Sequence, residues 1–149
     1  KKAMEIKIAP LKVKRKNFVH NPKVEKGTKV DHQVLKIEMG DELTRVDFMY
    51  RNPYDYSGWI QISRNSFIRV AGSQIKLGLV KAVNIPIAPT KHFFKRKGDY
   101  LAYTLYFPAL PKGTKKIDII EREASGGTWF NFYGVSMQTV WNDVLIVNN

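Results

Sequence analysis

YLAYTLYFPALPKGTKKIDIIEREASGGTWFNFYGV occupies residues 100–135 and contains three apolar runs of strand length. Two turn-rich breaks separate these runs, Pro-Ala-Leu-Pro-Lys-Gly at 108–113 and Ala-Ser-Gly-Gly at 124–127. In the first run Leu101, Tyr103, Leu105 and Phe107 occupy alternate positions, which is the two-residue period of a strand with one buried face. The stretch therefore predicts three consecutive strands whose aromatic side chains form the wall between two sheets.

The chain before this stretch shows the same period. Residues 4–16 alternate around Pro10, which lacks an N–H and indicates an edge strand or two strand pieces. Residues 29–39 predict a strand with a bulge, with a helix as the alternative, because Val30, Val34 and Ile37 do not keep one parity. The Asn21-Pro22 and Lys26-Gly27 pairs indicate a loop between these two segments.

The middle of the chain predicts a hairpin with a long aromatic loop. Val46, Phe48 and Tyr50 share one strand face, residues 52–58 carry the common turn residues, and a second strand follows at 59–63. Two more strands are expected at 67–70 and 74–83, and a last one at 140–147.

These patterns predict an all-β protein, a two-sheet antiparallel sandwich with about nine or ten strands. A closed barrel is the structural alternative. No repeat, linker or low-complexity segment divides the sequence, so residues 1–149 are expected to form a single domain. No apolar run is long enough to predict a membrane span.

Charge is unevenly distributed along the chain. The formal net charge is +12, and residues 1–36 hold eleven Lys or Arg and three acids. Residues 91–122 hold eight Lys or Arg and three acids. Outward lysines on solvated strands explain such clusters, and a surface for a polyanion is the functional alternative.

The sequence contains no recognisable catalytic or metal-binding pattern. There is no cysteine, which excludes disulfides and thiolate chemistry. The three histidines are isolated and are expected in loops or on the surface. Glu121 and Glu123 have the spacing of a carboxylate pair but lie beside a glycine turn, where a solvated strand end is expected. We therefore expect no enzyme, no cofactor and no metal site.

Aromatic and basic side chains are the better candidates for binding. Tyr54, Tyr56 and Trp59 lie in or beside the 52–58 loop, where a platform for sugar rings or bases is expected, with Trp129 and Trp141 as further members. For Trp129 and Phe132, however, the core between the two sheets is the expected location. The second candidate surface is basic and comprises Lys91, Lys95, Arg96 and Lys97, with the basic run from Lys12 to Lys16 as a further patch.

Several motifs resemble small β-sandwich domains of exported Bacteroidetes proteins, which occur alone or N-terminal to thioredoxin-like or hydrolase domains. They are Phe-Pro-Ala-Leu-Pro, Lys-Ile-Asp-Ile-Ile-Glu and Trp-Phe-Asn-Phe-Tyr-Gly-Val, together with Val46-Asp47-Phe48, Ser57-Gly58-Trp59-Ile60 and the segment from Gly78 to Pro89. The resemblance covers residues 43–135 and carries over no functional residue. It implies an immunoglobulin-like sandwich, a periplasmic or cell-surface location and an accessory or binding role.

Together with this resemblance, the sequence predicts a non-enzymatic exported domain that binds or scaffolds. Its partner is left open between a carbohydrate and another exported protein, and a lipid anchor ahead of Lys1 is also left open. Carbohydrate binding through the loop aromatics is the first alternative function. Polyanion or nucleic-acid binding through the basic segments is the second, although no RNP-like aromatic motif supports nucleic acid.

Overall fold

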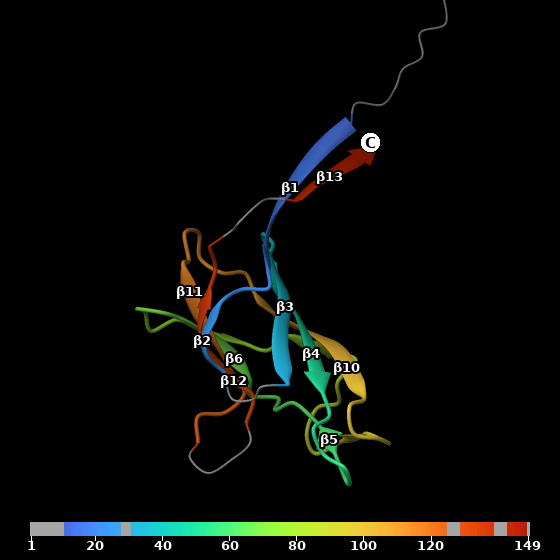
Figure 1. Cartoon of the computed structure of the whole chain (residues 1–149). Coiled ribbons are helices and arrows are strands. Elements are labelled where there is room, and N and C mark those ends of the chain that lie inside the picture. The colour runs from blue at the N-terminus through green and yellow to red at the C-terminus, as the bar shows by residue number, and fades with distance from the viewer. Residues whose placement is uncertain (1–10, 28–30, 125–128, 139–142, 149) are drawn as a thin grey trace, which may run out of the picture.

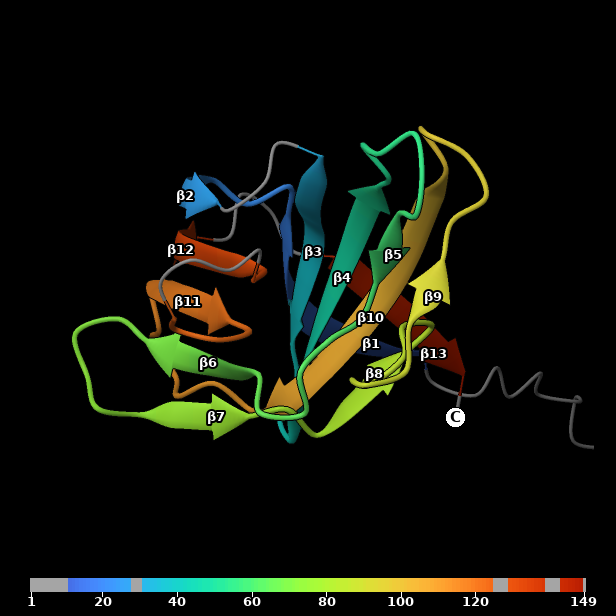
Figure 2. The same cartoon turned by 90° about the horizontal axis from the view of Figure 1, so that it is seen from below.

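Two antiparallel sheets form the body of the protein (Figure 1, Figure 2). The computed structural model describes residues 11–27, 31–124, 129–138 and 143–148. The first sheet has the order β13 (Asp143–Asn148), β1 (Leu11–His20), β3 (His32–Met39), β4 (Leu43–Arg51), β10 (Tyr100–Pro108), β8 (Lys81–Val83). The second has the order β2 (Val24–Gly27), β12 (Asn131–Ser136), β11 (Lys116–Ile120), β6 (Phe67–Val70), β7 (Lys76–Gly78). A small third sheet pairs β5 (Trp59–Ile60) with β9 (His92–Phe93).

This architecture confirms the two-sheet antiparallel sandwich. Figure 2 shows the two larger sheets as separate layers, so the barrel alternative is wrong. The described residues contain thirteen strands, more than the nine or ten expected, because several of them have only two to four residues. Within this part of the chain no helix has the length and apolar character to span a membrane.

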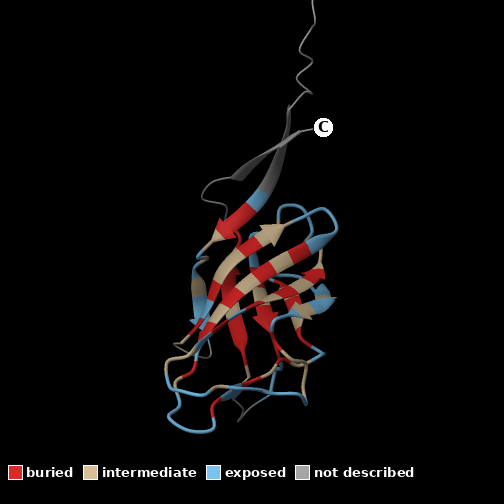
Figure 3. Cartoon of the chain, turned by 90° about the vertical axis from the view of Figure 1, so that its right-hand side faces the viewer, coloured by how far each residue is buried: buried red, intermediate tan, exposed pale blue. Residues whose placement is uncertain are grey.

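The opening stretch forms the centre of the sandwich as its alternation predicts. On β10 the side chains of Leu101, Tyr103, Leu105 and Phe107 are all buried, and the positions between them are more exposed (Figure 3). Aromatic rings fill the space between the layers. Phe48 of β4 stacks on Tyr103 with 4.8 Å between ring centroids and contacts Phe132 of the opposite sheet at 5.7 Å.

The irregular period of residues 29–39 has the expected cause. β3 pairs with β4 in a register that shifts between Val34 and Lys36, which is a bulge. The bulge lets both Val34 and Ile37 face the core, where each is buried. The helix alternative is therefore wrong over β3.

Three expectations about the strands need correction. β5 pairs with β9 and not with β4, whose neighbours are β3 and β10, so the expected hairpin does not form. The segment 74–83 splits into β7 and β8, which belong to different sheets. The expected loop near Lys26-Gly27 is strand β2. Within β1, residues 11–16 pair with β13 and residues 17–20 pair with β3, so the described part of the expected edge strand has a paired neighbour on one side only, while residues 1–10 lie outside the described residues.

Replacing Phe107 by Ala is expected to destabilise the fold by about 3–5 kcal/mol, because the ring is fully buried between the sheets and its removal leaves a cavity. The neighbouring Tyr106 points to the outer face of β10 and is only half-buried, so Tyr106→Ala is the matched control, with an expected loss of about 1 kcal/mol. Urea unfolding of both variants measures the difference. Equal losses in the two variants would contradict the assigned inward face of β10.

Candidate functional site

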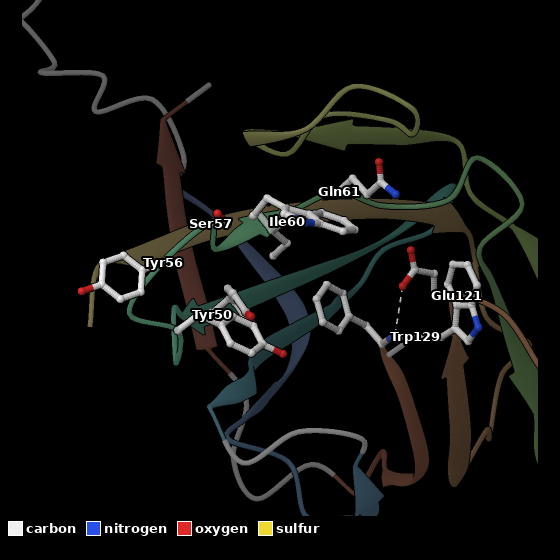
Figure 4. Close-up of a pocket in the computed structure, with 10 residues that line it drawn as sticks. Tyr50, Tyr56, Ser57, Ile60, Gln61, Glu121 and Trp129 are labelled. Carbon is white, nitrogen blue, oxygen red and sulfur yellow. Dashed lines mark hydrogen bonds between the residues drawn. The ribbon is translucent and has the colours of Figure 1, made fainter. Parts of the chain in front are cut away.

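A cavity of about 280 Å³ opens at the end of the sandwich away from the β1–β13 pair (Figure 1, Figure 4). It lies where β4 and β11 end and β12 begins, so both sheets contribute to its wall. The residues around it are mostly aromatic, with few polar groups: Tyr50, Tyr54, Tyr56, Ser57, Trp59, Ile60, Gln61, Glu121, Trp129 and Phe130. Figure 4 shows Tyr56 at one end of the cavity and Glu121 with Trp129 at the other.

Asn52 holds the aromatic loop in place. Its side chain is buried, and its Nδ2 donates to the carbonyl of Tyr54 at 3.2 Å and to the carbonyl of Arg96 at 2.9 Å. Its Oδ1 accepts from the backbone N–H of Tyr54 at 3.2 Å. Its backbone bonds to Gly98 and Asp99. One buried amide thus joins the 52–58 loop to the basic segment 91–99.

Gly58 is required for this packing. A Cβ added at position 58 would lie 2.1 Å from Asn52 Oδ1, closer than any real contact. The carbonyl of Gly58 also accepts a hydrogen bond from the N–H of Phe94 at 2.9 Å, which brings the 91–99 segment against the loop. The Ser-Gly-Trp sequence therefore sets how closely the loop and the basic segment approach each other.

Glu121 is the polar group at the inner end of the cavity. The residue is 5% exposed, and its carboxylate accepts backbone hydrogen bonds from Ser63 at 3.0 Å and Phe130 at 2.9 Å. Burial raises the pKa of this carboxyl, and the two backbone donors oppose that shift only in part. Each oxygen keeps a further lone pair that can accept a hydroxyl of a ligand.

Asn131 fixes the strand end that presents this carboxylate. Its Oδ1 accepts from the backbone N–H groups of Glu121 at 2.9 Å and Arg122 at 3.2 Å, and its Nδ2 donates to the carbonyl of Arg122 at 2.9 Å. β11 therefore ends at Ile120 with its last backbone groups satisfied by a side chain of β12. The first position after the strand turns inward.

Cations lie over two indole rings of the site. Lys91 Nζ is 4.3 Å from the ring centroid of Trp59, and the Arg122 guanidinium is 4.9 Å from that of Trp129. Both distances fall within the range of an attractive cation–π contact. Buried Tyr50 lies at the cavity wall, where desolvation raises its pKa to about 12, so its hydroxyl stays a hydrogen-bond donor at neutral pH.

The structure brings most of the sequence candidates together. Tyr54, Tyr56 and Trp59 all line the cavity. Lys91 contacts Trp59, while Lys95, Arg96 and Lys97 continue along the exposed segment that Asn52 holds beside the loop. The other basic run, Lys12 to Lys16, belongs to β1 at the opposite end of the molecule, so the two runs do not form one surface (Figure 1).

The remaining aromatic candidates have different locations. Trp129 is half-buried at the cavity and Phe132 is a core residue in contact with Phe48. Trp141 lies outside the described residues. Trp129 is therefore not the core residue that the sequence predicts, because it lies two positions before β12 and outside the strand that carries Phe132.

Two polar residues lie elsewhere than the sequence predicts. Glu121 was expected at a solvated strand end but is buried in the site, whereas Glu123 is exposed and pairs with Arg69 at 2.9 Å. His32 was expected in a loop or on the surface but is buried at the start of β3. Its Nε2 lies 2.5 Å from the hydroxyl of Tyr103. No sequence signal separates these buried polar groups from exposed ones, because their partners come from distant strands.

The residues that the structure describes include no group of three or more His, Asp or Glu side chains arranged to hold a metal ion. The chain matches no known protein family, no curated protein and no solved structure. The site's chemistry must therefore be argued from its own geometry.

Replacing Asn52 by Ala is expected to destabilise the protein by about 2–4 kcal/mol, because three hydrogen bonds of a buried amide to the backbone of Tyr54 and Arg96 are lost. Asn65, which is exposed in another loop, provides the matched Asn65→Ala control with an expected change below about 0.5 kcal/mol. Urea unfolding measures both. If the two variants are equally stable, Asn52 does not hold the loop.

Glu121 is expected to make stability depend on pH. Its pKa in the folded protein lies above the ordinary value of 4.5, so the folded state binds the proton more tightly than the unfolded state. This stabilisation is fully present below pH 4.5 and is lost as pH rises through the folded-state pKa. As pH rises through the folded-state pKa of Glu121, the free energy of unfolding of the wild type is therefore expected to fall relative to that of Glu121→Gln.

Urea unfolding of both proteins at a series of values between about pH 3.5 and 7 measures this difference. The variant serves as the control for all other carboxylates, since these titrate alike in both proteins. A wild-type stability that rises relative to the variant would show instead that the backbone donors outweigh burial.

Proposed function

We propose that this chain is a non-enzymatic binding domain that holds a sugar ring in the cavity formed by the aromatic loop and Glu121. The observation that carries the proposal is an aromatic wall that faces a buried hydrogen-bond acceptor across a small cavity. Ligand sites in proteins combine these features, with apolar and aromatic walls and a few placed polar groups. The cavity volume of about 280 Å³ suits a small ring or a short segment of a chain.

A sugar matches both parts of this site. The C–H bonds on one face of a pyranose ring are apolar and pack on the flat faces of aromatic side chains such as Trp59. The hydroxyls at the ring edge are donors, and Glu121 is a charge-bearing acceptor with free lone pairs. Gln61 adds an amide to the lining, and its Oε1 has no hydrogen-bond partner within the described part of the chain.

The carboxylates favour binding over hydrolysis. Most glycoside hydrolases use two carboxylates that flank the scissile bond. Among the cavity-lining residues that the structure describes, Glu121 is the only carboxylate, and Glu123 is engaged with Arg69. Glu121 is itself held by two backbone donors, so it is placed to accept a hydroxyl.

We also propose that the protein works outside the cytoplasm, as an accessory or scaffolding domain. The resemblance of residues 43–135 to sandwich domains of exported proteins supports this location. Fractionation of cells that express the native gene tests it. Recovery of the protein from the cytosol alone would contradict it.

Titration calorimetry against a panel of oligosaccharides tests the binding function. Wild type is expected to bind at least one saccharide, and Trp59→Ala is expected to weaken that binding by roughly tenfold, which corresponds to the lower end of the about 1–3 kcal/mol that a nucleobase gains by stacking on an aromatic ring. Tyr106→Ala removes an aromatic ring on the outer face of β10, away from the cavity, and is expected to keep wild-type affinity. If Trp59→Ala and the wild type bind the saccharide with equal affinity, the saccharide does not bind in this cavity.

The non-enzymatic part has its own test. Each bound saccharide is incubated with the protein and the products are analysed for cleavage. Turnover that disappears in Glu121→Gln would make this carboxylate catalytic and overturn the proposal.

A further inference from the structure

The basic segment beside the cavity has free positive charge. Lys91, Lys95, Arg96 and Lys97 are all exposed. Arg96 lies 3.8 Å from Asp99. Across the described residues no carboxylate lies within ion-pair distance of Lys91, Lys95 or Lys97. Three ammonium groups with no carboxylate partner in the described part of the chain, at the edge of the cavity, are an attractive site for an anionic ligand.

The aromatic wall continues from the cavity onto this segment. Trp59 of β5 and Phe93 of β9 are direct partners in the small sheet, and partners across an antiparallel pair project to the same face. Trp59 is 40% exposed and Phe93 is 64% exposed. Two accessible rings therefore lie side by side, and the Lys91 ammonium stands over the first of them.

A second hollow extends the same surface. It has a volume of about 290 Å³ and is lined by His92, Phe93, Phe94, Lys95, Asp99 and Tyr100. Tyr100 is as exposed as Phe93, and the Arg51 guanidinium lies 6.0 Å from its ring centroid. The surface thus runs from the cavity across β9 to β10, which is longer than a single ring requires.

Charge changes sign along this path. At the inner end the group that meets a ligand is the Glu121 carboxylate, which favours hydroxyl donors and repels anions. At the outer end the groups are lysines beside exposed rings, together with the Asp99 carboxylate, which faces Arg96. A ligand that fits both ends is a chain with neutral hydroxyl-bearing parts and separate anionic groups.

We propose that the ligand is an acidic polysaccharide, with sugar rings on the cavity and on Trp59 and Phe93 and with carboxylate or sulfate groups on Lys91, Lys95 and Lys97. This inference rests on the proposed carbohydrate-binding function and specifies its ligand class. A nucleic acid fits less well, because every unit of its backbone carries a phosphate and the cavity ends in a carboxylate.

Matched ligand pairs test the charge directly. Calorimetry compares an oligogalacturonate with its carboxyl-reduced neutral form, and a chondroitin sulfate oligosaccharide with its desulfated form, which together separate carboxylate from sulfate recognition. Single-stranded oligo-dT is the nucleic-acid probe. At least one acidic oligosaccharide is expected to bind about tenfold more tightly than its neutral form. Three exposed ion-pair contacts of a few tenths of a kcal/mol each together account for this factor. This advantage is expected to shrink as salt is raised.

A triple variant identifies the residues. Lys91→Gln, Lys95→Gln and Lys97→Gln together are expected to abolish the preference for the acidic form while binding of the neutral form persists. Lys26→Gln, Lys112→Gln and Lys115→Gln remove the same charge from exposed positions elsewhere and are expected to keep the preference.

The outcomes distinguish this inference from the function on which it rests. Equal affinity for acidic and neutral forms, or a preference that survives the Lys91, Lys95 and Lys97 changes, overturns the acidic-ligand inference and leaves sugar binding intact. Binding of oligo-dT more tightly than any saccharide overturns it in favour of nucleic acid. Failure of the folded wild type to bind any saccharide overturns the proposed function itself.

Discussion

The site depends on the buried amide of Asn52. An amide that is taken out of water must satisfy its hydrogen-bonding groups inside the protein, and Asn52 does so with backbone groups of Tyr54 and Arg96. These two residues belong to segments more than forty positions apart, so one side chain fixes the distance between the aromatic loop and the basic segment. Gly58 permits the contact because a side chain there would occupy the position of the amide. The pairing of β5 with β9 then extends from this fixed point.

Glu121 imposes a second constraint at the opposite wall. A buried carboxylate is costly unless hydrogen bonds compensate its lost hydration, and the N–H groups of Ser63 and Phe130 supply two. The two donors lie in different chain segments beside the cavity. The hydrogen bonds of the carboxylate therefore also hold these segments together. The raised pKa shows that compensation is incomplete. A ligand hydroxyl would complete it.

The sequence predicts the parts of this fold that follow from local periodicity. The inward faces of β4 and β10 were correct because alternation of apolar and polar residues along one strand is enough to assign them. Pairing was wrong where a strand is short: β5 has two residues, and its partner β9 is chosen by the contacts of Asn52 and Gly58 with the 91–99 segment. The same reason applies to residues 74–83. Their sequence predicts one continuous strand, but they form the short strands β7 and β8 in different sheets.

The sequence identifies some residues of the candidate site and misses others, and the difference again has a physical cause. Tyr54, Tyr56 and Trp59 could be identified from the sequence because a turn-rich loop is expected at the surface, where aromatic side chains are candidates for binding. All three line the cavity. Glu121 was missed because its burial depends on Asn131, a residue of the next strand whose side chain ends β11 and turns the following position inward. His32 was missed for the same reason, since its polar partner Tyr103 lies on a strand seventy-one positions away.

The arrangement explains how a sandwich of ordinary strands obtains a specific surface. The two sheets are held by aromatic packing in which Phe48 contacts both Tyr103 and Phe132, and no polar group of the cavity is needed for that contact. The loop and the 91–99 segment lie beyond the strand ends and are joined mainly to each other. Changes in Trp59, Phe93 or the lysines can therefore alter this surface without disturbing the packing between the sheets, whereas changes at Asn52 or Gly58 disturb the contact between the loop and the 91–99 segment.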